Sequence, residues 1–459
     1  MQLYVSRSAP RPAVRPVRAA GVLLAALAIA AIGWLVGPQA ATPSPDAAAV
    51  AAPPIPGGIP QSATGSADGR LDIAERIALW TARIREQPSD FLSWIQLAGA
   101  QGEQGRRAAD IGAYERALDA VDEALAIVPA YPPAFAVRAA VRYATHDFSG
   151  AVSDARYATE QLPTDAAAVA TLGDALLELG RTDDADAVFD DLAALAGGPG
   201  VDVRLARLAY VTGDGAAAVA HARAAYGASV RAGDPNVGFY AYALGEYARL
   251  AGDVVVARGG FEAALATRPD DLGALVGLAR IDAFDGRLDA AIAGLRRAAA
   301  IAPQPETLAL LGDLLAGRGD EAGARLQYDT VRLTSELSAL AGAVYDRQLS
   351  LFALDHGGAT EAILASARAA LDVRADAGGH DLVAWAAYRL GRLDEARRAS
   401  ESALATGTRD ARILFHAGAI ARAAGDADRG RELLREAIAL GPALDPLERA
   451  EAERLLAAH

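Results

Sequence analysis

Residues 241–270 read AYALGEYARLAGDVVVARGGFEAALATRPD, and this stretch decides the fold. The residues of this stretch that define the repeated pattern are Leu244, Gly245, Ala257, Phe261, Ala264 and Pro269. Small residues equivalent to Ala257 recur at a nearly constant interval, as Ala117, Ala151, Ala185, Ala218, Ala257, Ala291, Ala324, Ala362, Ala396 and Gly430. Their residue numbers differ successively by 34, 34, 33, 39, 34, 33, 38, 34 and 34. A period of 34 predicts a helix–turn–helix repeat, and therefore a solenoid.

The repeated pattern follows from how two helices pack. Antiparallel helices approach closely only where small side chains occupy the crossing point, which accounts for Gly245 in the first helix and Ala257 in the second. A large residue such as Phe261 then fills the space towards the next repeat. Proline ends the second helix because it cannot continue the hydrogen-bond ladder. Prolines stand at this place in several repeats, as Pro129, Pro163, Pro269, Pro303 and Pro442.

From about residue 90 to residue 442 the chain resembles the tetratricopeptide repeat family, whose repeat reads W-x2-L-G-x2-Y, then A-x3-F, then A, then P. Trp94-x2-Leu97 opens the first repeat, and Leu172–Gly173 marks the third. The resemblance implies an all-α, right-handed superhelical solenoid of about ten repeats, a fold that holds other proteins. The stretch 382–418 resembles the last repeats of bacterial members of the family, which implies a bacterial origin.

Composition narrows the possible functions. The chain has 459 residues, and all 44 of its basic residues are arginine. Beyond residue 70, 39 arginines face 56 acidic residues, a net charge of −17. Such an acidic chain is poorly suited to nucleic acid, which needs clustered cations to neutralise its phosphates. The absence of cysteine excludes disulfides, thiolate metal sites and cysteine catalysis.

The N-terminal residues predict a membrane anchor. A basic segment, residues 1–18, precedes an uncharged apolar stretch at residues 19–37. Nineteen helical residues span roughly 28 Å, which matches the hydrocarbon core of a bilayer. Because the local positive charge lies before this stretch, residues 1–18 should stay in the cytoplasm. We therefore expect a single-pass protein of the cytoplasmic membrane, with the solenoid on the extracytoplasmic side. A cleaved signal peptide is the alternative, although its apolar region is usually only 7–15 residues long.

The remaining boundaries follow from composition and periodicity. Residues 38–69 are rich in Pro, Ala and Gly and form a linker that cannot bury enough apolar surface to fold. Residues 70–88 should contain a helix that covers the open end of the first repeat. The solenoid should then occupy residues 89–442, and residues 443–459 should form a C-terminal capping helix with a polar outer face.

Two departures from the period predict local differences. In the first repeat, the residue numbers of Ala98 and Ala117 differ by 19, whereas those of Gly245 and Ala257 differ by 12. The additional length is about two helical turns, so both helices of that pair should be longer. The two longest intervals of the period, 39 and 38, indicate insertions near residues 227–235 and 334–340. We expect these insertions to bulge from the rim as longer loops.

The family resemblance also suggests a binding surface, because the first helix of each repeat lines the concave groove in that family. Helical register places the following side chains there: Tyr143, Asp174, Arg207, Tyr210, Phe239, Tyr242, Glu246, Arg249, Arg280, Asp313, Arg347, Trp385, Tyr388 and Arg422. A mixture of arginine and aromatic residues is typical of binding hot spots. It favours an extended or helical peptide partner that carries carboxylates. Alternatively, these arginines only pair with acidic residues of neighbouring helices.

No catalytic motif is present. The sequence lacks G-x-x-x-x-G-K-[ST], H-E-x-x-H and G-x-S-x-G. His380 and His416 should lie in adjacent repeats with Asp381 nearby, but a metal site needs three or four ligands. We therefore expect no enzyme activity, cofactor or metal.

The expected function is a membrane-tethered, non-catalytic scaffold that binds a protein or peptide in its concave groove. The alternative is a secreted, soluble, chaperone-like module released after signal-peptide cleavage. The partner and the oligomeric state are left open.

Overall fold

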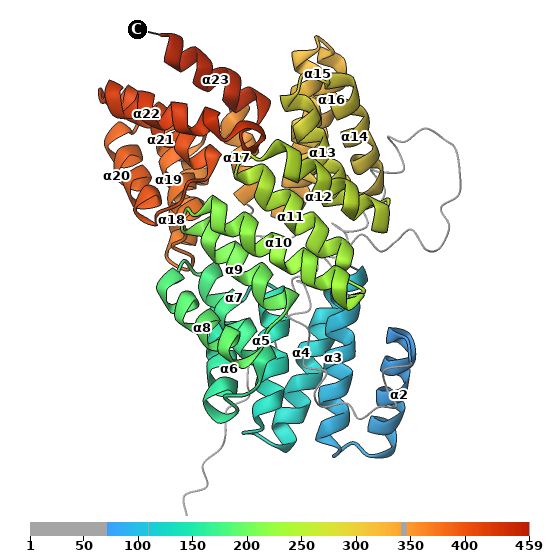
Figure 1. Ribbon diagram of the computed structural model, residues 1–459. Coiled ribbons are helices and arrows are strands. Elements are labelled where there is room, and N and C mark those ends of the chain that lie inside the picture. Colours follow the sequence, from blue (N-terminus) through green and yellow to red (C-terminus); the bar gives the residue numbers. More distant parts are fainter. Residues whose placement is uncertain (1–70, 109, 341–346, 459) are drawn as a thin grey trace, which may run out of the picture.

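The computed structural model describes residues 71–108, 110–340 and 347–458, and every regular element in these ranges is a helix (Figure 1). The helices pair as α3 (Phe91–Ala108) with α4 (Ile111–Ile127), α5 (Pro132–Ala144) with α6 (Phe148–Gln161), α7 (Ala166–Glu178) with α8 (Thr182–Leu195), α9 (Pro199–Val211) with α10 (Gly215–Ala232), α11 (Val237–Leu250) with α12 (Val254–Thr267), α13 (Leu272–Phe284) with α14 (Leu288–Ile301), α15 (Pro305–Gly317) with α16 (Glu321–Leu340), α17 (Arg347–Asp355) with α18 (Glu361–Leu371), α19 (Ala377–Arg389) with α20 (Leu393–Ala405) and α21 (Ala411–Ala423) with α22 (Ala427–Ala439). Before the pairs lies α2 (Ile73–Glu86), and after them η4 (Gly441–Ala443) and α23 (Pro446–Ala457). The predicted all-helical repeat fold is confirmed.

Local sequence sets where many of these helices begin. Asp271 and Asp410 each accept backbone hydrogen bonds at the start of a first helix, and Asp253 does the same for the second helix α12. Such capping satisfies amide groups that a helix cannot satisfy internally. Gly252, with φ of 82°, makes the turn between α11 and α12, a conformation that residues with a Cβ adopt rarely.

Glycines let large side chains enter between the helices. The ring of Phe261 is fully buried and lies against Gly245 of α11 and Gly277 of α13. A Cβ atom on Gly245 would lie 2.7 Å from this ring, and one on Gly277 would lie 2.3 Å from it. The aromatic position of the repeat therefore fixes the distance between neighbouring repeats.

The first repeat has the longer helices that the sequence predicted, because α3 has 18 residues and α4 has 17. The expectation of rim loops at residues 227–235 and 334–340 was wrong. The additional residues extend second helices instead, so α10 has 18 residues and α16 has 20. No proline interrupts either stretch before the helix ends, and α10 stops at Gly233, which adopts the left-handed conformation.

First helices line the inner side of the stack. Consecutive first helices contact one another, as α5 with α7, α11 with α13 and α19 with α21, and consecutive second helices contact one another less. The stack therefore curves towards its first helices. We call the inward sides of α5, α7, α9, α11 and α13 the inner face.

The curve brings distant repeats together. In Figure 1 the C-terminal helices, drawn in orange and red, lie beside the green helices of the middle repeats. Contacts support this arrangement, because η4 packs on α11 and α13, and α23 packs on α15. The C-terminal repeats thus lie directly against the middle of the chain.

The membrane anchor expected at residues 19–37, the basic segment 1–18 and the linker 38–69 lie outside the described residues. Within the described ranges, no helix is both long and apolar enough to span a bilayer.

The Phe261 contact gives a test of the packing. We expect Gly277→Ala to lower the free energy of unfolding by about 1–3 kcal/mol, because the added methyl group overpacks a closed core. Gly259→Ala is the matched control, since Gly259 is a helical glycine with nothing within 4 Å of the place that an added Cβ would take. It should be neutral or stabilising by up to about 1 kcal/mol. Urea unfolding of both variants measures the difference, and equal effects would contradict the role assigned to Gly277.

Candidate functional site

Several of the predicted groove residues meet on the inner face. Arg207 of α9 forms an ion pair with Glu178 of α7 and donates from Nη1 to the Tyr143 hydroxyl at 3.3 Å. Arg249 of α11 donates to both carboxylate oxygens of Glu246, at 3.0 and 2.6 Å. These arginines therefore have acidic partners on the same or the preceding first helix.

Aromatic side chains lie among these ion pairs. The Tyr210 and Tyr247 rings are 6.1 Å apart, and Tyr242 packs on Phe261 with ring centroids 6.0 Å apart. Burial raises the pKa of Tyr247 to about 12, with the charges around it as smaller causes. Phe239, also half-buried on α11, contacts the neighbouring Tyr240 ring. The tyrosines of the inner face thus remain protonated at any physiological pH.

The remaining predicted residues make other contacts. Trp385 is buried among the C-terminal repeats, where it stacks on Tyr388 at 5.1 Å and donates from Nε1 to Asp355 at 2.8 Å. Arg347 of α17 binds the Asp376 carboxylate, which also caps α19. Three further contacts are Asp174 with Arg204, Asp313 with Tyr328 and Arg422 with the Ala458 carbonyl.

Residues of the inner face bind the C-terminal repeats directly. We call this contact the seam, and its pairs are Glu178 with Arg374, Tyr210 with Asp410, Arg249 with Pro442, and Arg280 with Asp445. The Tyr210 hydroxyl donates to Asp410 at 2.5 Å, and Arg249 donates to the Pro442 carbonyl at 2.8 Å. The paired residues are 196, 200, 193 and 165 positions apart. Sequence reasoning missed the C-terminal partners, because a repeat pattern carries no signal for contacts at such separations.

Backbone also approaches closely across the seam. A Cβ on Gly213 would lie 2.1 Å from the Gly407 carbonyl oxygen, and one on Gly180 would lie 2.7 Å from that of Ala375. The equivalent turn glycines Gly391 and Gly425, away from the seam, have nothing within 4 Å. Both seam glycines have positive φ, so they serve the turn and the close contact together.

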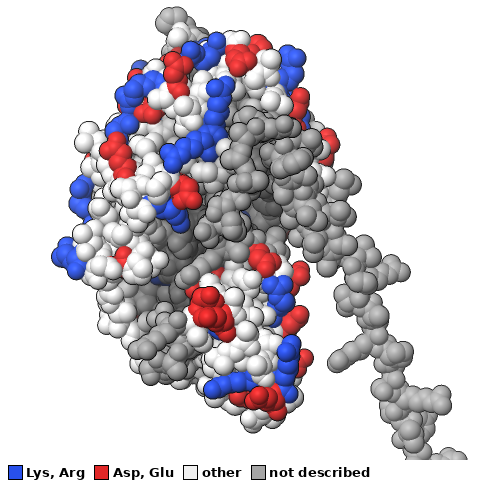
Figure 2. Space-filling view, turned by 90° about the vertical axis from the view of Figure 1, so that its right-hand side faces the viewer, with Lys and Arg blue, Asp and Glu red and all other residues white. Residues whose placement is uncertain are grey.

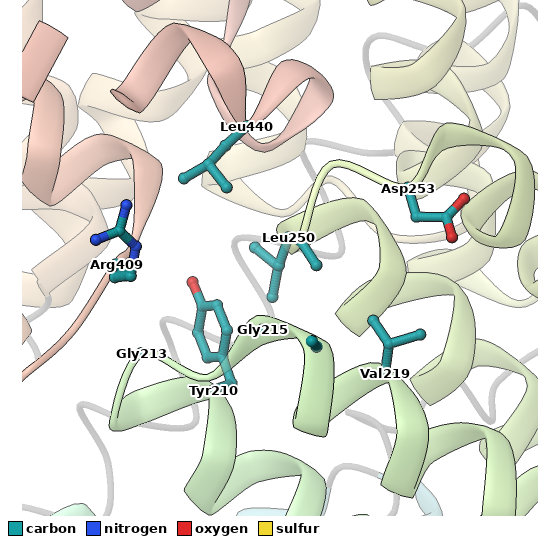
Figure 3. Close-up of a pocket in the computed structure, with 10 residues that line it drawn as sticks. Tyr210, Gly213, Gly215, Val219, Leu250, Asp253, Arg409 and Leu440 are labelled. Carbon is teal, nitrogen blue, oxygen red and sulfur yellow. The ribbon is translucent and has the colours of Figure 1, made fainter. Parts of the chain in front are cut away.

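A cavity of about 400 Å³ opens in the middle of the seam (Figure 3). Tyr210, Gly215, Val219 and Leu250 line it from the middle repeats, and Arg409 and Leu440 line it from the C-terminal repeats. The Arg409 side chain is 54% exposed and pairs with Glu436 at 3.2 Å. The seam is therefore incompletely filled at this point.

Three arginines converge where the seam meets α23. Arg280 binds Glu306 at 3.0 Å and also Asp445, and Arg412 donates to Asp445 at 3.4 Å. Burial lowers the pKa of Arg280, Glu306 opposes this effect, and the nearby charges of Arg249 and Arg412 lower the pKa further. The Asp445 carboxylate is thus held between two guanidinium groups. By contrast, arginines and acids are interspersed on the outer surface seen in Figure 2.

His416 makes a separate buried pair. Its Nδ1 lies 2.9 Å from Asp381, and its ring stacks on Trp385 at a centroid distance of 4.0 Å. Burial lowers the pKa of His416, but the charge and hydrogen bond of Asp381 outweigh burial, so the pKa is raised overall. Asp355 and Glu448 act in the same direction. Among the described residues, no group of three or more potential ligands could hold a metal ion.

Comparisons with known proteins show likeness of architecture. No protein-family model matches the sequence, and no curated protein matches it. Among solved structures, the human IFIT1 dimer with PPP-AAAA is similar at 16% identity, with a TM-score of 0.45 over 69% of this chain and 71% of that chain. The MamA protein is similar at 16% identity and TM-score 0.30, over 37% of this chain and 91% of that one. The APC/C hetero-tetramer Cut9–Hcn1 is similar at 14% identity and TM-score 0.30, over 84% and 93% of the two chains.

Independently of these neighbours, the described part of this chain is a helical-repeat solenoid built from ten successive helix pairs. The likeness concerns architecture alone.

The His416 pair predicts a pH dependence. Because folding raises the pKa of His416, its contribution to stability is complete below about pH 6.5, the ordinary histidine value, and is lost as pH rises through the raised pKa. We expect the difference in unfolding free energy between wild type and His416→Gln to shrink from pH 5.5 to 8.5. In an Asp381→Asn background, only burial and the weaker charges of Asp355 and Glu448 still act on the pKa of His416. The change with pH in the stability contributed by His416 should therefore become smaller or reverse its sign. An unchanged slope in Asp381→Asn would contradict this account.

Proposed function

We propose that the chain is a non-catalytic scaffold that binds a protein or peptide partner on its inner face. The observation that carries this proposal is the convergence of arginine, tyrosine and acidic side chains from α5, α7, α9 and α11 on one concave surface. Arg207 keeps 31% of its side chain exposed, although its partner Glu178 is only 12% exposed. A guanidinium held in place by a buried carboxylate can still donate to a ligand, and such preorganised arginines are frequent hot spots.

A variant that tests this function should leave the contacts of the seam in place. Arg249 and Arg280 are 7% and 9% exposed and bind the C-terminal repeats, so their replacement would disturb the seam as well as a ligand. Arg207 instead makes no polar contact of its own across the seam within the described ranges: it binds Glu178 and Tyr143 of the middle repeats, and glutamine at this position keeps a donor for Glu178, whose other carboxylate oxygen pairs with Arg374. Arg207→Gln is therefore the more specific variant.

We expect Arg207→Gln to lose the natural partner in a quantitative capture from crosslinked cells, by about tenfold, because one charged hydrogen bond to a ligand is worth about 1.5–3 kcal/mol. The matched control is Arg397→Gln, since Arg397 lies on the second helix α20 with 56% of its side chain exposed. That variant should capture the same proteins as wild type. Identical recovery with both variants would contradict binding at Arg207.

We further propose that residues 19–37 tether the scaffold to the cytoplasmic membrane. The support is the length and lack of charge of this stretch and the arginines before it. Residues 38–69 would then act as a spacer between the bilayer and the solenoid.

Extraction of membranes with alkaline carbonate tests the tether. Full-length protein should stay in the membrane pellet, whereas a variant without residues 19–37 should be released. Release of the full-length protein would overturn the anchor. Recovery of a soluble form whose N-terminus follows this stretch would instead support signal-peptide cleavage and the chaperone-like alternative.

A further inference from the structure

The seam differs from the rest of the molecule because no apolar core crosses it in the described ranges. The buried apolar cluster of the C-terminal repeats runs from Leu351 to Ala452 and contains no residue of the middle repeats. The clusters of α5–α16 on the other side likewise contain no described residue of α18–α23. The two sides of the seam therefore keep separate cores.

Polar contacts take the place of that missing core. Besides the four pairs of the seam, the Arg374 guanidinium lies 5.3 Å from the Phe148 ring and the Arg449 guanidinium 5.0 Å from the Phe284 ring. Polar contacts of this kind characterise interfaces between parts that move relative to one another. The cavity at Tyr210, Leu250 and Leu440 adds to this character, because it leaves the seam incompletely packed there, whereas protein cores are closely packed.

The charges of the seam can be hydrated once it opens. Arg280 is 9% exposed and Asp445 14% exposed in the closed arrangement. Burying such a pair costs about as much desolvation as the attraction returns, so separation of both partners into water is nearly balanced. Arg249 also keeps its partner Glu246 on the same helix when it loses the Pro442 carbonyl. Opening therefore leaves no charge stranded in an apolar environment.

Residues 440–445 show which chemical groups Arg249 and Arg280 bind across the seam. In this segment, the Pro442 carbonyl binds Arg249 and the Asp445 carboxylate binds Arg280. A backbone carbonyl followed three residues later by a carboxylate is a feature that an acidic peptide can reproduce. Asp445 also lies between Arg280 and Arg412, which makes this the place on the seam where a carboxylate is best held.

We propose that the C-terminal repeats form a clasp over the inner face. In the closed solenoid, residues 440–445 occupy Arg249 and Arg280, and an acidic segment of a protein partner takes their place when the clasp opens. This inference rests on the proposed scaffold function and adds to it the chemistry of the partner and the step that admits it. The clasp moves as one unit, because α17–α23 share one core.

The absence of cysteine allows the clasp to be measured directly in the full chain. Spin labels are attached at Ala216→Cys of α10 and Ala405→Cys of α20, two exposed positions on opposite sides of the seam. The control pair is Ala216→Cys with Val255→Cys of α12, and Val255 is 82% exposed. Both control labels lie on the middle repeats, so their separation reports on the solenoid without the clasp.

Pulsed electron double resonance then gives the distance distributions. We expect one short cross-seam distance in dilute buffer, and a second, longer distance in 0.5 M NaCl or with a ten-residue glutamate peptide. The closed population should fall at least about twofold, since salt stabilises separated charges. Arg249→Gln with Arg280→Gln should favour the longer distance without any addition. The control pair should not change, and a ten-residue lysine peptide should have no effect.

Each alternative result overturns a stated part of the proposal. A cross-seam distance that is constant under all conditions rules out the clasp. Opening by salt but not by the glutamate peptide, or equally by the lysine peptide, rules out an acidic partner. A negative result in the capture experiment with Arg207→Gln would overturn partner binding at Arg207 and not the clasp, because that experiment does not measure the distance across the seam.

Discussion

Close contact between a glycine on one helix and a large side chain from a neighbouring helix sets the spacing of the whole stack. Phe261 fills this role against Gly245 and Gly277, and Phe189 does so against Gly173. Other repeats use different large residues, as in the Tyr328 contact with Gly312 and the Leu434 contact with Gly418. Small rotations between successive repeats accumulate along such a stack. The accumulated curvature brings the C-terminal repeats back against the inner face, so the seam depends on packing that occurs many residues away.

Aspartate links the local and the distant parts of this architecture. Asp410 caps α21 and accepts a hydrogen bond from the Tyr210 hydroxyl across the seam, and Asp445 stands at the N-cap position of α23 and binds Arg280. Asp376 caps α19 and binds Arg347 of the preceding repeat. The same carboxylate that starts a helix thereby fixes where this helix sits against its neighbour. These three aspartates thus have structural partners of their own.

The sequence was sufficient for the features that are local. The repeat period, the glycine positions and the long first pair could all be predicted, since each depends on residues within one or two repeats. The extension of α10 and α16 was missed, because a spacing between small residues cannot tell a longer loop from a longer helix. Register also placed Arg207, Tyr210 and Arg249 on first helices. The partners of Tyr210 and Arg249, which are Asp410 and Pro442, could not be predicted, since their positions depend on small rotations summed over several repeats.

The seam also constrains how such a chain can change in length. Helical-repeat arrays usually tolerate the gain or loss of a unit, because each unit contacts only its neighbours. Here Glu178 must meet Arg374, and Arg249 must meet the Pro442 carbonyl, at almost the same separation of 196 and 193 residues. One repeat added between the two sides would shift every such pair by a full unit. The enclosed repeats are therefore fixed in number, and the array is free to grow only outside them.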